Sequence, residues 1–229
     1  MDTILYFACV LALAFALYTQ IKVRSTYKRY SRESTVCGLA AHQVARMILD
    51  MNGLHDVRVE CISGSLNDHY DSRNRVIRLS SSVYNSSSAA AVGIAAHEVG
   101  HALQYATSYA PIKARQALVR TQGFASSFTW IVIMIAFFVL SFNATLGYYV
   151  LLLGIGLFSL IALFELVTLP CEFNASRRAL ACLREMGTYS EPELSVSKKV
   201  LSAAAMTYVA ALVSTVVQII RLLNIIDRR

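Results

Sequence analysis

The sequence predicts a mainly α-helical membrane protein, in which about four transmembrane helices accompany a small cytoplasmic α+β unit. Hydrophobic residues make up 56% of the 229 residues and charged residues only 15%, whereas a soluble domain has about 25% charged residues. Four apolar segments each approach the ~20 residues that cross a hydrocarbon core. Basic residues outnumber acidic ones by 21 to 14 and flank these segments. Together these observations exclude an ordinary soluble globule and a disordered chain.

The first apolar segment, residues 3–21, contains no charged residue. A cleaved signal peptide is the alternative, but only Met1 and Asp2 precede the segment, so the basic start of a signal peptide is missing. The basic residues follow it instead: Lys22, Arg24, Lys28, Arg29 and Arg32. We therefore predict an uncleaved anchor over residues 1–21, with the N-terminus outside and the next segment in the cytoplasm.

Three further apolar segments lie in the second half of the chain. Residues 124–142 and 146–169 are separated only by the uncharged Asn143-Ala144-Thr145. This spacing predicts a transmembrane hairpin over 124–169. The last segment predicts a C-terminal transmembrane helix and tail over 201–229.

The distribution of basic residues predicts on which side the connecting segments lie. Four crossings place residues 22–123 and 170–200 on one side, and these two segments hold 18 of the 21 basic residues. We therefore expect both in the cytoplasm. Arg221, Arg228 and Arg229 follow the fourth segment and would lie outside. The alternative is that this segment lies along the membrane interface instead of crossing.

The long segment between the first two spans predicts a small α+β unit. Residues 39–50 place apolar side chains at helical spacing, and residues 89–105 form an Ala-rich helical stretch. Residues 56–63 alternate as in a half-buried strand, and two further strands are predicted at 66–71 and 75–79.

The second of these helices contains the sequence His97-Glu98-Val99-Gly100-His101. Residues four apart lie on one face of a helix about one turn apart, so both imidazoles can bind a single zinc ion. Glu98 stands where a carboxylate could accept a proton from the water that zinc activates. The alternative is a histidine pair that packs on its helix without a metal.

Zinc in a catalytic site needs a third protein ligand, and Glu172 is the main candidate. It directly follows the third apolar segment, at the end predicted to face the cytoplasm, where the two histidines also lie. Glu165 is a weaker candidate because it would lie deeper in the bilayer, where an ionisable group is costly. Glu172 could instead be an interfacial carboxylate paired with Arg177 or Arg178.

Three stretches of the chain resemble the bacterial membrane-bound neutral zinc metallopeptidase family. They are His97-Glu98-Val99-Gly100-His101-Ala102-Leu103-Gln104, the upstream Asp68-His69-Tyr70-Asp71 with Arg78-Leu79-Ser80, and Pro170-Cys171-Glu172-Phe173-Asn174-Ala175-Ser176-Arg177-Arg178. The Glu172-Phe173-Asn174-Ala175 stretch also resembles the third-ligand segment of the wider gluzincin membrane proteases, which implies the same role for Glu172. Those enzymes carry Asp where this chain has Ser176.

The resemblance implies a zinc-dependent peptidase of the bacterial plasma membrane, with a zincin-like unit and one zinc ion per chain. The ligands would be His97, His101 and Glu172, with Glu98 as the catalytic base. An oxyanion or substrate contact could come from any of His69, Tyr70, Arg177 and Arg178.

The function predicted from the sequence is that of a metalloendopeptidase, which cuts membrane or membrane-associated polypeptides at the cytoplasmic membrane surface. A non-catalytic, zinc-stabilised membrane scaffold or assembly partner is the alternative. The expected partners are a polypeptide substrate and the lipid bilayer, and a homo-oligomer is left open. We expect no nucleic-acid partner, because no run of Lys and Arg interleaved with aromatic residues occurs in a water-facing stretch.

Overall fold

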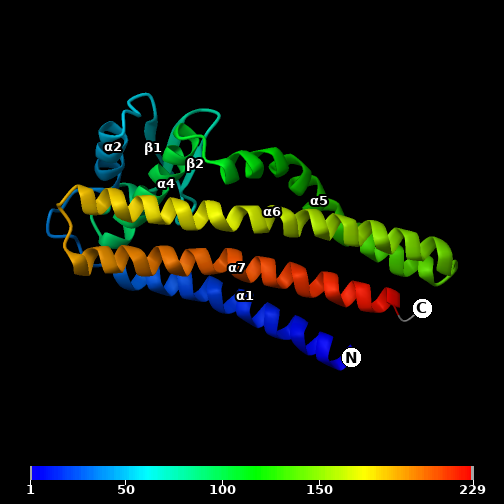
Figure 1. Cartoon of the computed structure of the whole chain (residues 1–229). Coiled ribbons are helices and arrows are strands. Elements are labelled where there is room, and N and C mark those ends of the chain that lie inside the picture. Colours follow the sequence, from blue (N-terminus) through cyan, green and yellow to red (C-terminus); the bar gives the residue numbers. More distant parts are fainter. Residues whose placement is uncertain (1, 228–229) are drawn as a thin grey trace. The chain divides into compact units, whose positions relative to one another are not determined.

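The computed structural model describes residues 2–227 and is mostly helical (Figure 1). Met1 and the two terminal arginines of the predicted tail, Arg228 and Arg229, lie outside the described residues. The elements are, in chain order, α1 (Asp2–Tyr30), α2 (Ala41–Met51), β1 (Arg58–Ile62), β2 (His69–Asp71), β3 (Val76–Ser80), α3 (Ser81–Tyr84), α4 (Ala89–Ala106), α5 (Ala110–Leu140), α6 (Ala144–Glu185) and α7 (Glu191–Asp227).

The chain divides into two compact units, and four helices, α1, α5, α6 and α7, contribute to both. The helical unit comprises residues 1–18, 113–169 and 207–229. Within these ranges the structure describes residues 2–18, 113–169 and 207–227. The mixed unit comprises Thr19–Ile112 and Pro170–Met206, and it contains all three strands.

The sheet of the mixed unit has the strand order β1-β3-β2. β1 pairs parallel with β3, and β2 pairs antiparallel with it, with His69 opposite Arg78. The central strand β3 is almost wholly buried, and three of its five residues, Val76, Ile77 and Leu79, are apolar. β2 is therefore an edge strand.

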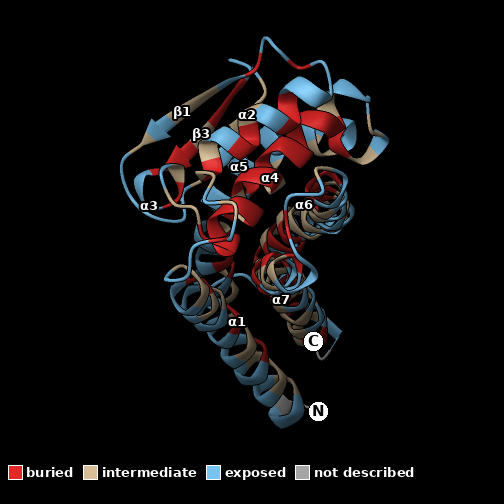
Figure 2. Ribbon diagram, turned by 90° about the vertical axis from the view of Figure 1, so that its left-hand side faces the viewer, coloured by how far each residue is buried: buried red, intermediate tan, exposed pale blue. Residues whose placement is uncertain are grey.

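Helix α4 lies at the centre of the mixed unit, and Figure 2 shows most of it buried. Ser88 caps its N-terminus, because the Ser88 Oγ atom accepts a hydrogen bond from the Ala91 amide at 3.2 Å. Two glycines let other helices approach closely: a Cβ atom at Gly100 would lie 2.4 Å from the Ala175 carbonyl oxygen of α6, and one at Gly93 would lie 2.9 Å from the Ser197 Cβ atom of α7. α4 is thus packed against both helices.

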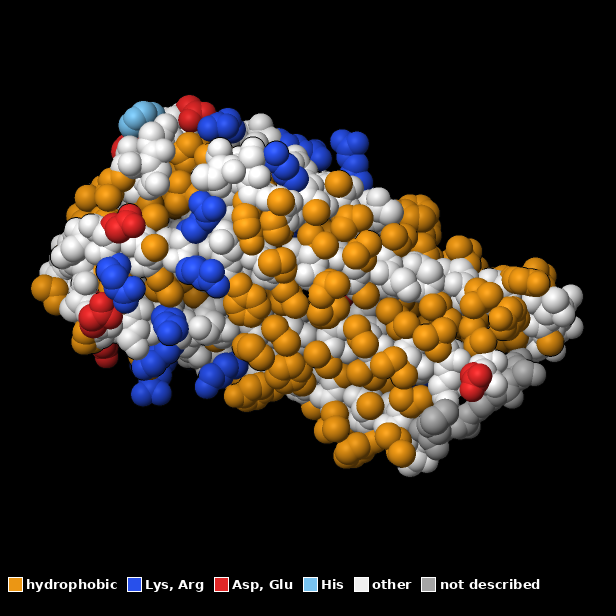
Figure 3. All heavy atoms as spheres, viewed as in Figure 1, with side chains coloured by type: hydrophobic (Ala, Val, Ile, Leu, Met, Phe, Trp, Pro, Cys, Tyr) orange, Lys and Arg blue, Asp and Glu red, His pale blue; other side chains and the backbone are white. Residues whose placement is uncertain are grey.

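Among the described residues of the helical unit, few large apolar side chains are buried, and many are exposed. Its buried cluster is small and centres on Ile133, Leu151 and Phe158. Many large apolar residues are exposed instead, including Phe138 and Leu153, and the parts of α6 and α7 that belong to this unit present mainly hydrophobic side chains in Figure 3. Four helices of the described chain, α1, α5, α6 and α7, are long and apolar enough to cross a membrane. The prediction of a mainly helical chain with four such helices and a small sheet is confirmed.

The long helices extend beyond the predicted spans. α1 continues to Tyr30 and α5 begins at Ala110, so residues 22–30 and 110–123 are helical. Hydropathy marks only the part of a helix that suits hydrocarbon, whereas the backbone hydrogen bonds continue into water. Lys28 and Arg29 in the last turn of α1 also favour a longer helix, because cations stabilise a helix C-terminus.

Candidate metal centre

Two helices of the mixed unit bring the three predicted ligands together. α4 carries His97 and His101, and α6 carries Glu172. The Glu172 Oε2 atom lies 3.3 Å from His97 Nε2 and 3.5 Å from His101 Nε2. One ligand atom from each residue lies within 4.8 Å of the other two, a grouping that could hold a metal ion.

The outer edge of each imidazole contacts a polar side chain. His97 Nδ1 lies 3.1 Å from the Ser176 Oγ atom, and His101 Nδ1 lies 3.1 Å from the Gln104 Oε1 atom. If each Nδ1–H donates to its oxygen, each Nε2 lone pair faces Glu172. This is the tautomer that a metal ligand needs.

Gln104 is completely buried and ties α4 to α6. Its Nε2 atom donates to the Cys171 carbonyl oxygen at 2.7 Å and to the Asn174 Oδ1 atom at 3.1 Å. A carbonyl oxygen can only accept, so the amide must turn its NH₂ group toward Cys171 and its oxygen toward His101. The orientation of His101 is therefore fixed by the helix that carries Glu172.

Glu98 and His101 titrate in a buried environment. Burial raises the pKa of the Glu98 carboxyl above its ordinary value, against the opposing charges of His97 and His101. Burial lowers the pKa of His101, but the hydrogen bond and charge of Glu172 outweigh it, so the pKa of His101 is raised overall. Glu98 is only 7% exposed, and its carboxylate accepts no hydrogen bond from the residues that the structure describes. It is thus available to exchange a proton.

His69 and Tyr70, two of the residues predicted to contact the oxyanion or the substrate, lie outside the grouping of ligand atoms. His69 on β2 is exposed, and its Nδ1 atom donates to the Asn67 carbonyl oxygen at 2.9 Å. Tyr70 packs edge-on against Tyr105 of α4, with ring centroids 5.6 Å apart. Neither residue belongs to the grouping of ligand atoms found among residues 2–227.

The two arginines after Glu172 differ from each other. Arg178 donates from Nε to the Asn174 Oδ1 atom at 2.9 Å and lies over the Tyr109 ring. Arg177 points to another face of α6 and is exposed. Arg178 thus helps to hold the Gln104 network, whereas Arg177 does not.

Glu165, the weaker candidate ligand, lies in the helical unit, where its carboxyl hydrogen-bonds to Thr215. It is absent from the one metal-ligand grouping of the described chain. The helix position seven residues before Glu172 therefore does not bring Glu165 into that grouping.

Two polar residues of the site had no role in the sequence-based prediction. Gln104 was only part of the motif that carries the resemblance, although its position three residues after His101 places both on one helix face. Ser176 stands four residues after Glu172 and contacts His97, at the position where the gluzincin membrane proteases carry Asp. The same i, i+4 spacing within α6 could have indicated it.

Comparison with known proteins assigns the chain to a family. Residues 5–227 match the family described as "Putative neutral zinc metallopeptidase". The chain belongs to this family. The chain is also 41% identical over 219 residues to "Putative membrane protease YugP" of Bacillus subtilis (strain 168). The aligned residues cover 96% of the chain and 95% of that relative. No solved structure is significantly similar to the chain. The resemblance predicted from the sequence is confirmed.

The ligand atoms fit the zinc ion that the family name implies. Zinc takes imidazole nitrogen and carboxylate oxygen at about 2.0–2.2 Å, so two ligands of a tetrahedral ion lie about 3.3–3.5 Å apart. The 3.3 and 3.5 Å separations from the Glu172 oxygen to the two histidines match that spacing. Three protein ligands also leave the fourth position open, as in a catalytic site.

Proposed function

We propose that the chain is a zinc-dependent membrane endopeptidase of the gluzincin type. One zinc ion would be held by His97, His101 and Glu172. The observation that carries this proposal is the approach of the buried Glu172 carboxylate to both Nε2 atoms from a different helix. A helical histidine pair alone would be weaker support, because it can also pack without a metal.

The reaction would be hydrolysis of a peptide bond. When bound, zinc supplies a Lewis acid that polarises the scissile carbonyl and makes water acidic near neutral pH. Glu98 takes a proton from the attacking water and passes it to the leaving amine. Its raised pKa suits this role, because a more basic carboxylate accepts a proton more readily.

Ser176 and Gln104 would act as positioning residues. In this role each would accept a hydrogen bond from an Nδ1–H group, which would keep the opposite nitrogen of the ring unprotonated and aimed at the ion. Gln104 also holds α4 against α6, so it keeps His101 and Glu172 in register.

The substrate is proposed to be a membrane or membrane-associated polypeptide. The edge strand β2 offers unpaired backbone groups to which an extended peptide could add. Tyr70 on this strand packs against α4, the helix of the candidate ligands. His69, Tyr70, Arg177 and Arg178 stay candidates for oxyanion or substrate contacts.

We place the mixed unit on the cytoplasmic side of the plasma membrane, on the distribution of basic residues. The native Cys61 on β1 is exposed and reports on this directly. In intact cells a membrane-impermeant maleimide should leave Cys61 unlabelled, and it should label it once the membrane is opened. Labelling in intact cells would place the mixed unit outside.

The experiment that tests the catalytic role compares the zinc-loaded full chain with the Glu98→Gln variant. Both are incubated with a library of random peptides, and new amino termini are counted by mass spectrometry. The wild-type chain should cleave, and the variant should be slower by about 10³-fold or more while it retains zinc. Equal cleavage by both would remove Glu98 as the base. No cleavage by the zinc-loaded wild type would favour the scaffold alternative.

A further inference from the structure

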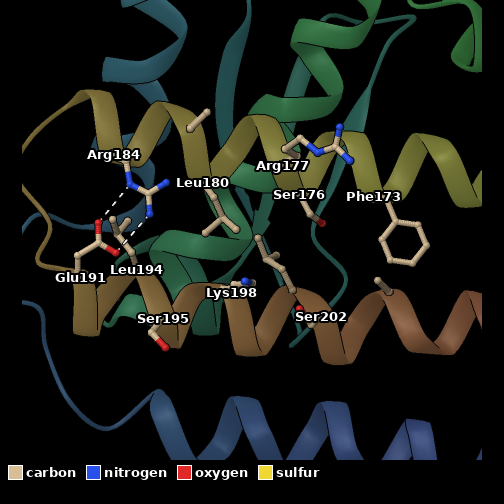
Figure 4. A pocket seen from close by; sticks show the side chains of 13 residues that line it. Phe173, Ser176, Arg177, Leu180, Arg184, Glu191, Leu194, Ser195, Lys198 and Ser202 are labelled. Atoms are coloured by element: carbon tan, nitrogen blue, oxygen red, sulfur yellow. Dashed lines mark hydrogen bonds and ion pairs between the residues drawn. The ribbon is translucent and has the colours of Figure 1, made fainter.

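A cavity of about 690 Å³ lies in the mixed unit between α6 and α7 (Figure 4). Its apolar lining includes Leu180, Leu194 and Leu201, and its basic lining consists of Arg177, Arg184 and Lys198. A cavity with both kinds of lining suits a ligand that is itself amphiphilic.

The positive charge of this cavity is only partly neutralised. Arg184 forms an ion pair with Glu191 across the cavity, with Nε 3.2 Å from Oε1. Arg177 and Lys198 have no ion-pair or hydrogen-bond partner within residues 2–227, and no other acidic residue of that range lines the cavity. Two cations are therefore left for an anionic ligand.

Basic and apolar residues are mixed along the cavity: Leu194 lies beside the Arg184–Glu191 pair, and Arg177 lies nearer to Phe173 (Figure 4). The Arg184–Glu191 pair lies at one end, and Phe173 lies at the other (Figure 4). On α7, Lys198 and Lys199 precede the uncharged stretch 200–220, and Leu201 lies about one turn after Lys198 on the same face. A lysine at the end of such a stretch is expected at the level of the lipid headgroups.

We propose that this cavity binds an anionic phospholipid. The phosphate pairs with Lys198 and Arg177, and the first part of an acyl chain lies along Phe173 and Leu201. The apolar lining favours a lipid over a free inorganic anion, because a free anion gains nothing from apolar contact.

The position of Ser176 separates this cavity from the substrate position of the metal centre. Ser176 lines the cavity and contacts Nδ1 of His97, the edge of the ring that points away from Glu172. His97, Glu98, His101 and Glu172 do not line it. The cavity thus lies behind a candidate zinc ligand, which favours a lipid over the polypeptide to be cleaved.

Native mass spectrometry of the full chain in detergent tests the proposal, with phosphatidylglycerol and phosphatidylcholine as the two probes. Lys198→Ala should weaken phosphatidylglycerol binding about fivefold, the effect of about 1 kcal/mol expected for one basic residue at a headgroup. Lys199→Ala is the matched control, because Lys199 lies over the Tyr30 ring and does not line the cavity. It should change binding by less than about twofold.

A second variant tests the cavity without removing a charge. Ser202 lines the cavity and is exposed, so Ser202→Trp should fill the space while the chain stays folded, as checked by circular dichroism. It should weaken phosphatidylglycerol binding by at least as much as Lys198→Ala. A variant that binds as well as the wild type would overturn the assignment of this cavity.

Three further outcomes would contradict the lipid assignment. Equal losses in Lys198→Ala and Lys199→Ala, or equal binding of both lipids, would mean general attraction to a basic surface. Benzoylphenylalanine at position 195, a residue of the lining, should cross-link to phospholipid in membranes. Cross-linking to polypeptide alone would assign the cavity to a protein partner instead.

Discussion

The two units of the chain place their apolar residues in opposite ways. In the mixed unit a large cluster of apolar side chains is buried, and Ile48, Leu49 and Ile77 in it are 0–1% exposed, although single residues such as Val36 are exposed. In the helical unit Phe138 is 68% exposed, and Leu153 is 58% exposed. Burial of apolar surface stabilises the first arrangement in water. The second arrangement has no such benefit in water and suits a lipid solvent.

The polar residues of the two units differ in the same sense. In the helical unit the hydroxyls of Thr129, Ser159 and Thr168 each donate to the carbonyl four residues earlier in their own helix. Such bonds satisfy the hydroxyl without linking two helices. In the mixed unit Gln104 and Ser176 instead link α4 with α6. The Glu165–Thr215 bond also joins two helices of the helical unit, α6 and α7, but Glu165 does not belong to the ligand grouping of the described chain.

Removal of a carboxylate from each unit should give the largest difference between them. Glu172→Ala removes a proposed ligand and should lower zinc content from about one ion per chain to a small fraction, because two histidines alone bind zinc weakly. Glu165→Ala, on the same helix but in the helical unit, should keep stoichiometric zinc. Metal analysis of both purified variants measures this, and the reverse pattern would make Glu165 the ligand.

A methyl group added to one glycine in each unit should give an intermediate effect. Gly100→Ala puts a Cβ atom 2.4 Å from the Ala175 carbonyl oxygen, a backbone atom that cannot move alone. We expect a loss of about 3 kcal/mol in unfolding free energy. Gly156→Ala in the helical unit meets nothing within 4 Å and should be neutral or stabilising. Denaturant titration in detergent compares the two, and equal losses would show that α4 and α6 do not pack closely at Gly100.

Replacement of one hydrogen-bonded polar residue in each unit should give the smallest difference between the units, here measured as zinc affinity. Gln104→Met keeps the volume but loses the bond to His101 Nδ1, which should weaken zinc binding about tenfold. Thr129→Val in the helical unit removes only a bond within α5 and should leave zinc affinity unchanged. Competition with a chelator measures both affinities. An unchanged affinity in Gln104→Met would mean that His101 is positioned without this contact.

Much of the fold followed from local patterns. The helix at 89–105 and the strands at 56–63, 66–71 and 75–79 agree with α4, β1, β2 and β3 within a few residues. Periodicity is a local property, so these elements could be recognised from short stretches. The extension of α1 to Tyr30 does not follow from hydropathy, and the local signal for it is the pair Lys28 and Arg29 in the last turn.

In the candidate site, too, some residues could be predicted from local sequence patterns and others could not. The spacing of His97 and His101 is local, and Glu172 was indicated by its place at the end of an apolar segment. The roles of Gln104 and Ser176 depend on how α4 packs on α6 at Gly100. Such packing between distant segments cannot be read from spacing along one helix.

The central claim is that two imidazoles and one carboxylate bind a single zinc ion. X-ray absorption at the zinc edge of the purified full chain tests it most directly. The account predicts nitrogen and oxygen neighbours at about 2.0–2.2 Å, including two imidazoles, and loss of the carboxylate contribution in Glu172→Ala to which zinc has been added back. Sulfur neighbours at about 2.3 Å, or a wild-type spectrum unchanged in Glu172→Ala, would contradict it.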